Sequence, residues 1–112
     1  MTEGKIDISR ASKAIRDSRF VEALSMLESN LAKDPDHLES LYFAAVCSRY
    51  LKNYKDSQKY LENLLSKAPD MGRAYQELGH LSKATGNEDN AASHYRQACE
   101  LNPALISSWK SL

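Results

Sequence analysis

Few residues of this chain could carry out chemistry, and their spacing does not gather them into a site. The three histidines are His37, His80 and His94, and no H-x-x-x-H pattern is present. His80 and His94 fall on different predicted helices, so ordinary helical histidines are favoured over a metal site. The sequence contains no G-x-x-x-x-G-K-[ST], G-x-G-x-x-G or G-x-S-x-G motif for phosphates, dinucleotides or a serine nucleophile. We therefore expect no metal, no cofactor and no enzyme active site.

The composition is that of one ordinary folded domain. Hydrophobic residues make up 42% and charged residues 27% of the 112 residues. Fifteen basic and fifteen acidic side chains cancel, so the whole molecule has no net field that attracts nucleic acid or an anionic membrane. No apolar run approaches the ~20 residues that span a bilayer, and the start of the chain lacks a secretory signal. These features predict a cytoplasmic protein in which Cys47 and Cys99 are buried hydrophobes rather than a disulfide.

The positions of the prolines reveal an internal repeat. Pro35, Pro69 and Pro103 are the three prolines of the chain, and each lies 34 residues from the next. Overlaying residues 4–37, 38–71 and 72–105 aligns small residues with small ones and large apolar residues with large ones. We expect the two small columns to face each other, because two helices approach closely only where a side chain is short. These columns hold Ala11, Ala45 and Gly79, and Ala23, Ser57 and Ala91, while a large column holds Leu27, Leu61 and Tyr95.

Each unit is predicted to be a helical hairpin. Two helical patterns are joined by a short break near residues 17–19, 52–53 and 86–87. In the third unit, Gly86 can adopt a positive φ and Asn87 can cap the helix that follows. A proline comes just after each second helix, where it ends one hairpin because it has no N–H to donate.

The aligned columns resemble the tetratricopeptide repeat, whose 34-residue pattern is W-x2-L-G-x2-Y…A-x3-F…P. The third unit matches best, through YQELG at 75–79, Ala91 and Tyr95 four residues apart, and Pro103. The resemblance covers residues from about 4 to the end. It implies an all-α fold, a right-handed α-solenoid of three helix hairpins at about 4–37, 38–71 and 72–105, plus a C-terminal seventh helix. A generic four-helix bundle would need neither the fixed period nor the small columns.

We expect a single domain over residues 1–112. The last residues, ISSWKSL at 106–112, repeat the start of a unit, with Trp109 and Leu112 in the columns of Tyr75 and Leu78. They are either a capping helix or a partial fourth repeat of a longer protein. An unfinished C-terminal edge at Trp109 would also allow a homodimer with a second copy.

In the tetratricopeptide family, the first helix of each hairpin lines a concave groove that receives an extended peptide or a helix of a partner. The resemblance carries this role to one set of columns, in which six residues are basic and one is acidic. The nine candidates that we single out are Lys5, Arg16, Tyr42, Arg49, Tyr50, Arg73, Gln76, His80 and Lys83, and the remaining columns hold Ile8, Ser12, Ile15, Glu39, Val46, Ala84, Ser107 and Lys110. The alternative interpretation is a charged helix face that only keeps the protein soluble.

One subtype of the family can be tested residue by residue. Some tetratricopeptide domains hold the terminal carboxylates of heat-shock chaperones with a Lys, two Asn, a second Lys and an Arg. The matching columns here are Ile8, Ser12, Phe43, Arg73 and Glu77, of which only Arg73 fits. Glu77 places a negative charge where the carboxylate would lie, so binding of that type is disfavoured.

The resemblance therefore implies a protein–protein interaction or scaffolding module that binds a peptide or helical segment, with an acidic segment favoured by the basic columns. Nucleic acid is a weaker rival, because the chain has no net charge. As an alternative function, this segment would be the N-terminal region of a larger bacterial enzyme, such as a sulfotransferase or glycosyltransferase. It would then position a substrate or partner without catalysing a reaction itself.

Overall fold

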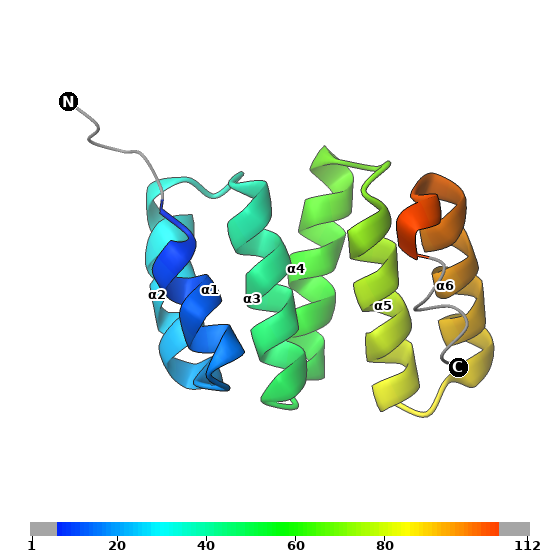
Figure 1. The fold of residues 1–112 in the computed structure, drawn as a ribbon, viewed down its shortest axis with the longest axis horizontal. Helices are drawn as coiled ribbons and strands as arrows, with labels where there is room; N and C mark the ends of the chain where they lie inside the picture. The colour runs from blue at the N-terminus through cyan, green and yellow to red at the C-terminus, as the bar shows by residue number, and fades with distance from the viewer. Residues whose placement is uncertain (1–6, 106–112) are drawn as a thin grey trace.

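The computed structural model describes residues 7–105 of the chain, and this part is helical throughout (Figure 1). The first hairpin consists of α1 (Ser9–Arg16) and α2 (Phe20–Lys33). The second hairpin consists of α3 (Leu38–Tyr50) and α4 (Tyr54–Lys67), and the third of α5 (Gly72–Ala84) and α6 (Glu88–Leu101). A short 3-10 helix, η1 (Pro103–Leu105), follows α6. The predicted breaks between helices are therefore confirmed, while the predicted seventh helix at 106–112 lies outside the described residues.

The turn inside each hairpin contains one residue in the left-handed conformation. Its φ is 60° at Ser18, 65° at Lys52 and 82° at Gly86, and these three positions lie 34 residues apart. Only the third turn was predicted from its glycine. The other two turns adopt the same backbone because their flanking helices are held in the same arrangement, although an L side chain there costs about 1–2 kcal/mol.

Replacing Lys52 with glycine should therefore stabilise the protein. Lys52 is exposed, and its backbone N–H donates to the carbonyl of Arg49, a bond that glycine keeps. We expect Lys52→Gly to raise the free energy of unfolding by up to about 1 kcal/mol, because the relief of left-handed strain exceeds the added entropy of the unfolded chain. Urea unfolding followed by circular dichroism measures the change. Lys59→Gly, at an exposed position in the second turn of α4, is the control and should destabilise by about 1 kcal/mol. Equal effects at the two positions would contradict the argument.

The prolines stop the second helices at the same point in each unit. The helices α2, α4 and α6 end two residues before Pro35, Pro69 and Pro103, and the residue between is non-helical. At the next helix start, the predicted cap at Asn87 is confirmed, since its side chain accepts from the backbone N–H of Asn90 at 3.1 Å. An unpredicted cap starts α3, where the ring of His37 accepts from the N–H of Ser40.

The buried side chains form two clusters, each shared between neighbouring hairpins. One cluster joins α1, α2 and α3, and the other joins α3, α4 and α5. The fully buried leucines Leu27, Leu61 and Leu64 belong to these clusters. Each hairpin thus buries part of its apolar surface only against the next one, as a stacked repeat requires.

The small columns meet as predicted in the second hairpin, where the hydroxyl of Ser57 donates to the carbonyl of Ala45 at 2.9 Å. In the third hairpin, the atoms nearest to a Cβ added at Gly79 belong to the ring of Tyr95. The ring can approach α5 this closely because Gly79 has no side chain.

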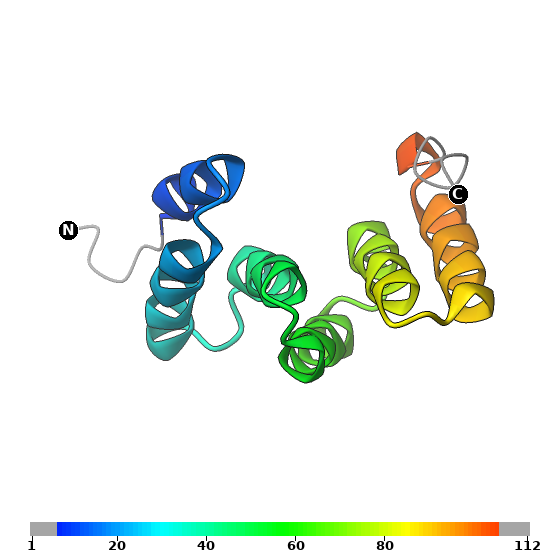
Figure 2. The same ribbon diagram turned by 90° about the horizontal axis from the view of Figure 1, so that it is seen from below.

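The hairpins are arranged along an arc, which Figure 2 shows with the helices seen near their ends. The first helices of the hairpins, α1, α3 and α5, lie along the inner side of the arc, and α2 and α4 lie along its outer side (Figures 1 and 2). We call the surface formed by α1, α3 and α5 the inner face. The prediction of an all-α solenoid built from hairpins is confirmed.

Candidate functional site

The inner face carries most of the residues that were predicted to bind a partner. Tyr42, Arg49 and Tyr50 lie on α3, whereas Arg73, Gln76, His80 and Lys83 lie on α5. Arg16 lies at the end of α1. Lys5, Ser107 and Lys110 lie outside the described residues, so the structure does not place them.

An ion pair joins the last turn of α3 to the middle of α5. The guanidinium of Arg49 donates from Nε to one carboxylate oxygen of Glu77 and from Nη2 to the other at 3.4 Å. The side chain of Glu77 is 2% exposed and that of Arg49 is 17% exposed. Burial raises the pKa of Glu77, and the hydrogen bond and charge of Arg49 oppose that shift. A two-point pair of this kind fixes the position of both side chains as well as neutralising them.

Beside the ion pair, an aromatic side chain is covered by a second guanidinium. The Cζ atom of Arg73 lies 4.3 Å from the ring centre of Tyr42 and 5.9 Å from that of Phe43. Cation–π contacts of this kind hold a guanidinium flat against the ring. Arg73 is exposed, and none of the salt bridges among residues 7–105 involves it. Its charge therefore remains available to a ligand.

Tyr50 links the first hairpin to the second. Its ring stacks on that of Phe20 with centroids 4.4 Å apart and planes 3° apart. On α3, the Cζ atom of Arg49 lies 4.5 Å from the Tyr50 ring centre. Tyr50 is nevertheless 53% exposed. It therefore offers a fixed aromatic surface at the edge of the inner face.

His80 is held by Tyr95 from the neighbouring helix α6. Nδ1 of His80 and the hydroxyl of Tyr95 form a hydrogen bond, and the two rings meet edge to face. Burial, together with the charges of Arg49 and Lys83, lowers the pKa of His80 to about 4. His80 is therefore uncharged near neutral pH, and it contributes a polar rather than a cationic group to the face.

The first hairpin contributes less to the inner face than was predicted. Arg16 is exposed and donates from Nη1 to the hydroxyl of Ser12 at 3.3 Å. Ile8 and Ile15 pack against the first buried cluster instead of standing free on the surface. On α3, Val46 is 9% exposed and belongs to the floor of the face. The overlay of repeat units assigns these three apolar residues to the surface, because it does not take into account how much of each helix is covered by the next helix.

Glu77 and Tyr95 were missed as contributors to the site. The sequence alone presents Glu77 only as a negative charge that disfavours a ligand carboxylate. It presents Arg49 only as one of six basic residues without a partner. A partial signal existed in the sequence, because an acid in a column that otherwise holds Ser9 and Phe43 is unusual enough to suggest a buried partner. The partner itself is not identified by the overlay, since the pair connects different columns of different units.

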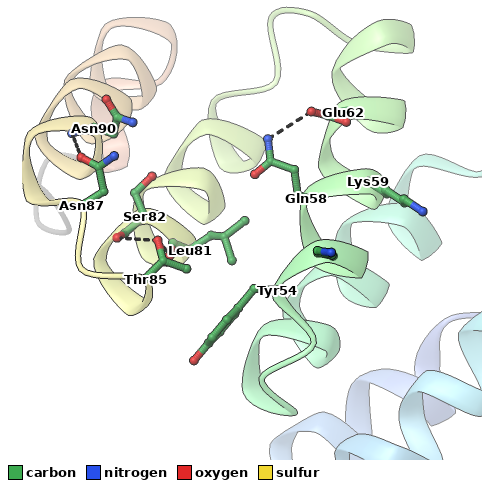
Figure 3. Close-up of a pocket in the computed structure, with 10 residues that line it drawn as sticks. Tyr54, Gln58, Lys59, Glu62, Leu81, Ser82, Thr85, Asn87 and Asn90 are labelled. Carbon is green, nitrogen blue, oxygen red and sulfur yellow. Dashed lines mark hydrogen bonds between the residues drawn. The ribbon is translucent and has the colours of Figure 1, made fainter.

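A separate hollow lies between α4 and the turn from α5 to α6 (Figure 3). It measures about 530 Å³. Its polar groups already bond to one another, as when Gln58 donates to Glu62 and the Thr85 hydroxyl donates to carbonyls of α5. Because these groups satisfy each other, the hollow presents no set of groups converging on a ligand.

Metal and thiol chemistry find no support in the described residues. Between residues 7 and 105, no group of three or more His, Cys, Asp and Glu side chains is placed to hold a metal ion. Cys47 is buried, and this burial together with the charge of Glu77 raises the pKa of its thiol to about 11. The thiol is therefore protonated near neutral pH and a poor nucleophile.

None of the helices within residues 7–105 combines the length and the apolar character that crossing a membrane would take.

Comparison with known proteins supplies matches at the level of family and fold. Two family models described as tetratricopeptide repeat match residues 14–79 and 72–105. A curated repeat-containing protein of Rhizobium etli is 27% identical over 94 residues, which cover 84% of this chain and 46% of the relative. The chain thus spans about half the length of that relative.

Solved structures with the same fold include the protein MamA and a repeat domain of Spaghetti (RPAP3). MamA has a TM-score of 0.81 at 16% identity, over 93% of this chain and 61% of the MamA chain. The Spaghetti domain, solved with an HSP90 peptide of sequence SRMEEVD, has a TM-score of 0.79 at 16% identity, over 92% of this chain and 84% of that domain. At these identities the likeness concerns the fold.

Proposed function

The chain belongs to the tetratricopeptide repeat family, and we propose that it binds a segment of another protein along its inner face. The observation that carries this proposal is the arrangement of Arg73, which is exposed and lies over the ring of Tyr42 without a carboxylate partner among the described residues. A fixed guanidinium on an aromatic ring offers both charge and apolar area to a ligand. The Spaghetti domain of the same fold is known with a bound peptide, which supports a peptide as the kind of ligand.

Charge complementarity favours a partner segment with acidic side chains. Arg16, Arg73 and Lys83 are exposed at the borders of the inner face. In the described part of the chain, none of the three takes part in a salt bridge. Cations placed this way attract an acidic segment and orient it, with an attraction that weakens as salt is added.

The packing of the helices determines which of the two binding partners loses more conformational freedom on association. The side chains of the inner face are already fixed by the ion pair, the ring stack and the hydrogen bond of His80. A flexible partner segment would therefore lose most of the conformational freedom on association, while this chain loses little. Such a division suits a scaffolding module that presents one rigid surface to short segments.

The test is a selection of 12-residue peptides by display on the purified chain, followed by titration of the selected peptides against variants. We expect Tyr42→Ala and Arg73→Ala each to weaken binding about tenfold, since aromatic and arginine anchors dominate such interfaces. Lys59→Ala is the matched control, because Lys59 is an exposed cation on the outer helix α4. Peptides whose affinity is unchanged by both inner-face variants would refute the proposed surface.

The alternative function, a positioning region of a larger sulfotransferase or glycosyltransferase, stays a prediction. It makes the same use of the inner face and differs only in what the rest of such a protein would do.

A further inference from the structure

A neutral pair lies between two exposed cations of the inner face. Arg49, in the last turn of α3, reaches across to Glu77, which lies on α5 between Arg73 and Lys83, and both of its hydrogen-bonded nitrogens point to the carboxylate of Glu77. The ring of Tyr42 packs against the cluster that contains Leu78, the residue after Glu77. We call this region the centre of the inner face, and Arg73 and Lys83 its borders. His80 is next to Arg49 and uncharged near neutral pH. The central surface therefore contains one neutralised ion pair, one aromatic ring and one neutral imidazole.

Glu77 takes the position that a carboxylate of a ligand would need. A guanidinium binds a carboxylate best through two parallel N–H donors, and Arg49 already uses two donors on Glu77. Glu77 cannot move aside cheaply, because it is 2% exposed and a buried carboxylate without its partner is strongly disfavoured. A second carboxylate at this point would therefore meet a neutral pair with no spare charge to attract it.

The borders of the face behave differently. Arg73 lies over the rings of Tyr42 and Phe43, and it takes part in no salt bridge among residues 7–105. Lys83, in the last turn of α5, is exposed. Carboxylates of a ligand can therefore be held at the borders but not at the centre.

We infer that Glu77 is a specificity-determining residue that excludes a carboxylate from the centre of the inner face by occupying Arg49 itself. This inference rests on the proposed function and adds to it the pattern of the partner. The segment that fits has acidic side chains facing Arg73 and Lys83, and an uncharged apolar or aromatic side chain over the ion pair and His80. An acidic tail that places its carboxylate at the centre is rejected, because the desolvation of that carboxylate is not compensated.

The inference is tested by titrating the fluorescently labelled peptide SRMEEVD into the native chain and into variants, at low and moderate salt. We expect Glu77→Gln to bind this peptide about tenfold more tightly or better, since it frees Arg49 to make one charge-assisted contact. Glu28→Gln is the matched control, because Glu28 is exposed on the outer helix α2 and its loss changes the net charge equally. It should change the affinity by less than about threefold, as a screened surface charge does.

Two further variants show whether any gain in peptide affinity comes from Arg49. Arg49→Gln combined with Glu77→Gln should return the affinity to that of the native chain. Arg49→Leu combined with Glu77→Leu replaces the pair by apolar groups, a change that buried pairs commonly tolerate, and it should bind the peptide as the native chain does. This last variant keeps the test decisive if Glu77→Gln folds poorly, which thermal melting would show.

The results that would overturn the inference are distinct from those that would overturn the proposed function. The inference is wrong if Glu77→Gln gains no more affinity than Glu28→Gln, if the gain persists without Arg49, or if the double leucine variant loses about tenfold in affinity. In each of these cases, the affinity of the display-selected peptides would still depend on Tyr42 and Arg73. The proposed function is instead wrong if those peptides bind the Tyr42 and Arg73 variants as tightly as the native chain.

Discussion

Replacing Leu61 with alanine will lower the free energy of unfolding by about 3 kcal/mol, the effect typical of a buried leucine whose surroundings cannot collapse into the space left behind. Leu61 lies on α4, is 0% exposed and belongs to the cluster shared by the second and third hairpins. Its loss opens a cavity at the contact between repeats as well as inside one. Because neighbouring repeats stabilise each other mainly through such contacts, the transition should also become less cooperative.

Urea unfolding followed by circular dichroism measures this effect as a lower midpoint. The matched control is Leu101→Ala, the same chemical change at a residue of α6 that is 38% exposed. We expect the control to cost less than about 1 kcal/mol, because little apolar area is returned to water there. Equal losses at the two positions would mean that the shared cluster is not what holds the second and third hairpins together.

Replacing Gly79 with valine will destabilise the protein by about 3 kcal/mol or more, at the upper end of what overpacking costs. A Cβ atom at Gly79 would lie 2.7 Å from Cε1 and 2.8 Å from Cδ1 of the Tyr95 ring. The ring cannot rotate away freely, since Tyr95 is 2% exposed and its hydroxyl is bonded to His80. The substitution must therefore separate α5 from α6 or expel Tyr95, and either change breaks the bond to His80.

Thermal melting and urea unfolding of Gly79→Val, beside Ala84→Val on the same helix, test this prediction. Ala84 is exposed at the end of α5, so the control reports the propensity of valine without packing and should cost less than about 1 kcal/mol. Combining Gly79→Val with Tyr95→Ala should cost less than the sum of the single changes, because the removed ring leaves room for the valine. Strict additivity of the two would show that Gly79 and Tyr95 do not compete for the same space.

These two positions also affect the proposed binding surface, each through a different residue. Leu61 belongs to the cluster against which Tyr42 packs, so Leu61→Ala should weaken the binding of selected peptides through Tyr42 even while it remains folded. Gly79 positions Tyr95, which holds His80 on the inner face. We therefore expect the Gly79→Val variant to bind the peptides less tightly even under conditions where the variant is still folded.

The helices that carry the candidate residues were predicted, but the pairing of their charges was not. Tyr42, Arg49, Arg73 and His80 lie on the inner helices as the family pattern implied. The count of six cations against one acid, however, treated every charged side chain as exposed. The structure pairs Arg49 with Glu77 and leaves His80 uncharged near neutral pH, so the basic character is confined to the borders of the face.

The sequence by itself determined the hairpins, because the features that define them act locally. A proline ends a helix wherever it occurs, a glycine permits a left-handed turn, and a short side chain permits close approach within one hairpin. All three recur with the 34-residue period and can be recognised by overlaying the units. Even the turns at Ser18 and Lys52, which lack glycine, adopt the conformation seen at Gly86.

Only the tertiary structure decided which charges are neutralised. Arg49 and Glu77 are 28 residues apart, on helices of different hairpins. The same two columns one unit earlier hold Ile15 and Phe43, which pack against the first buried cluster, so the relation is not repeated and cannot be found by overlaying units. A charged side chain is stable either in water or in a well-formed ion pair. Which of the two it adopts depends on whether the next hairpin removes the water around it.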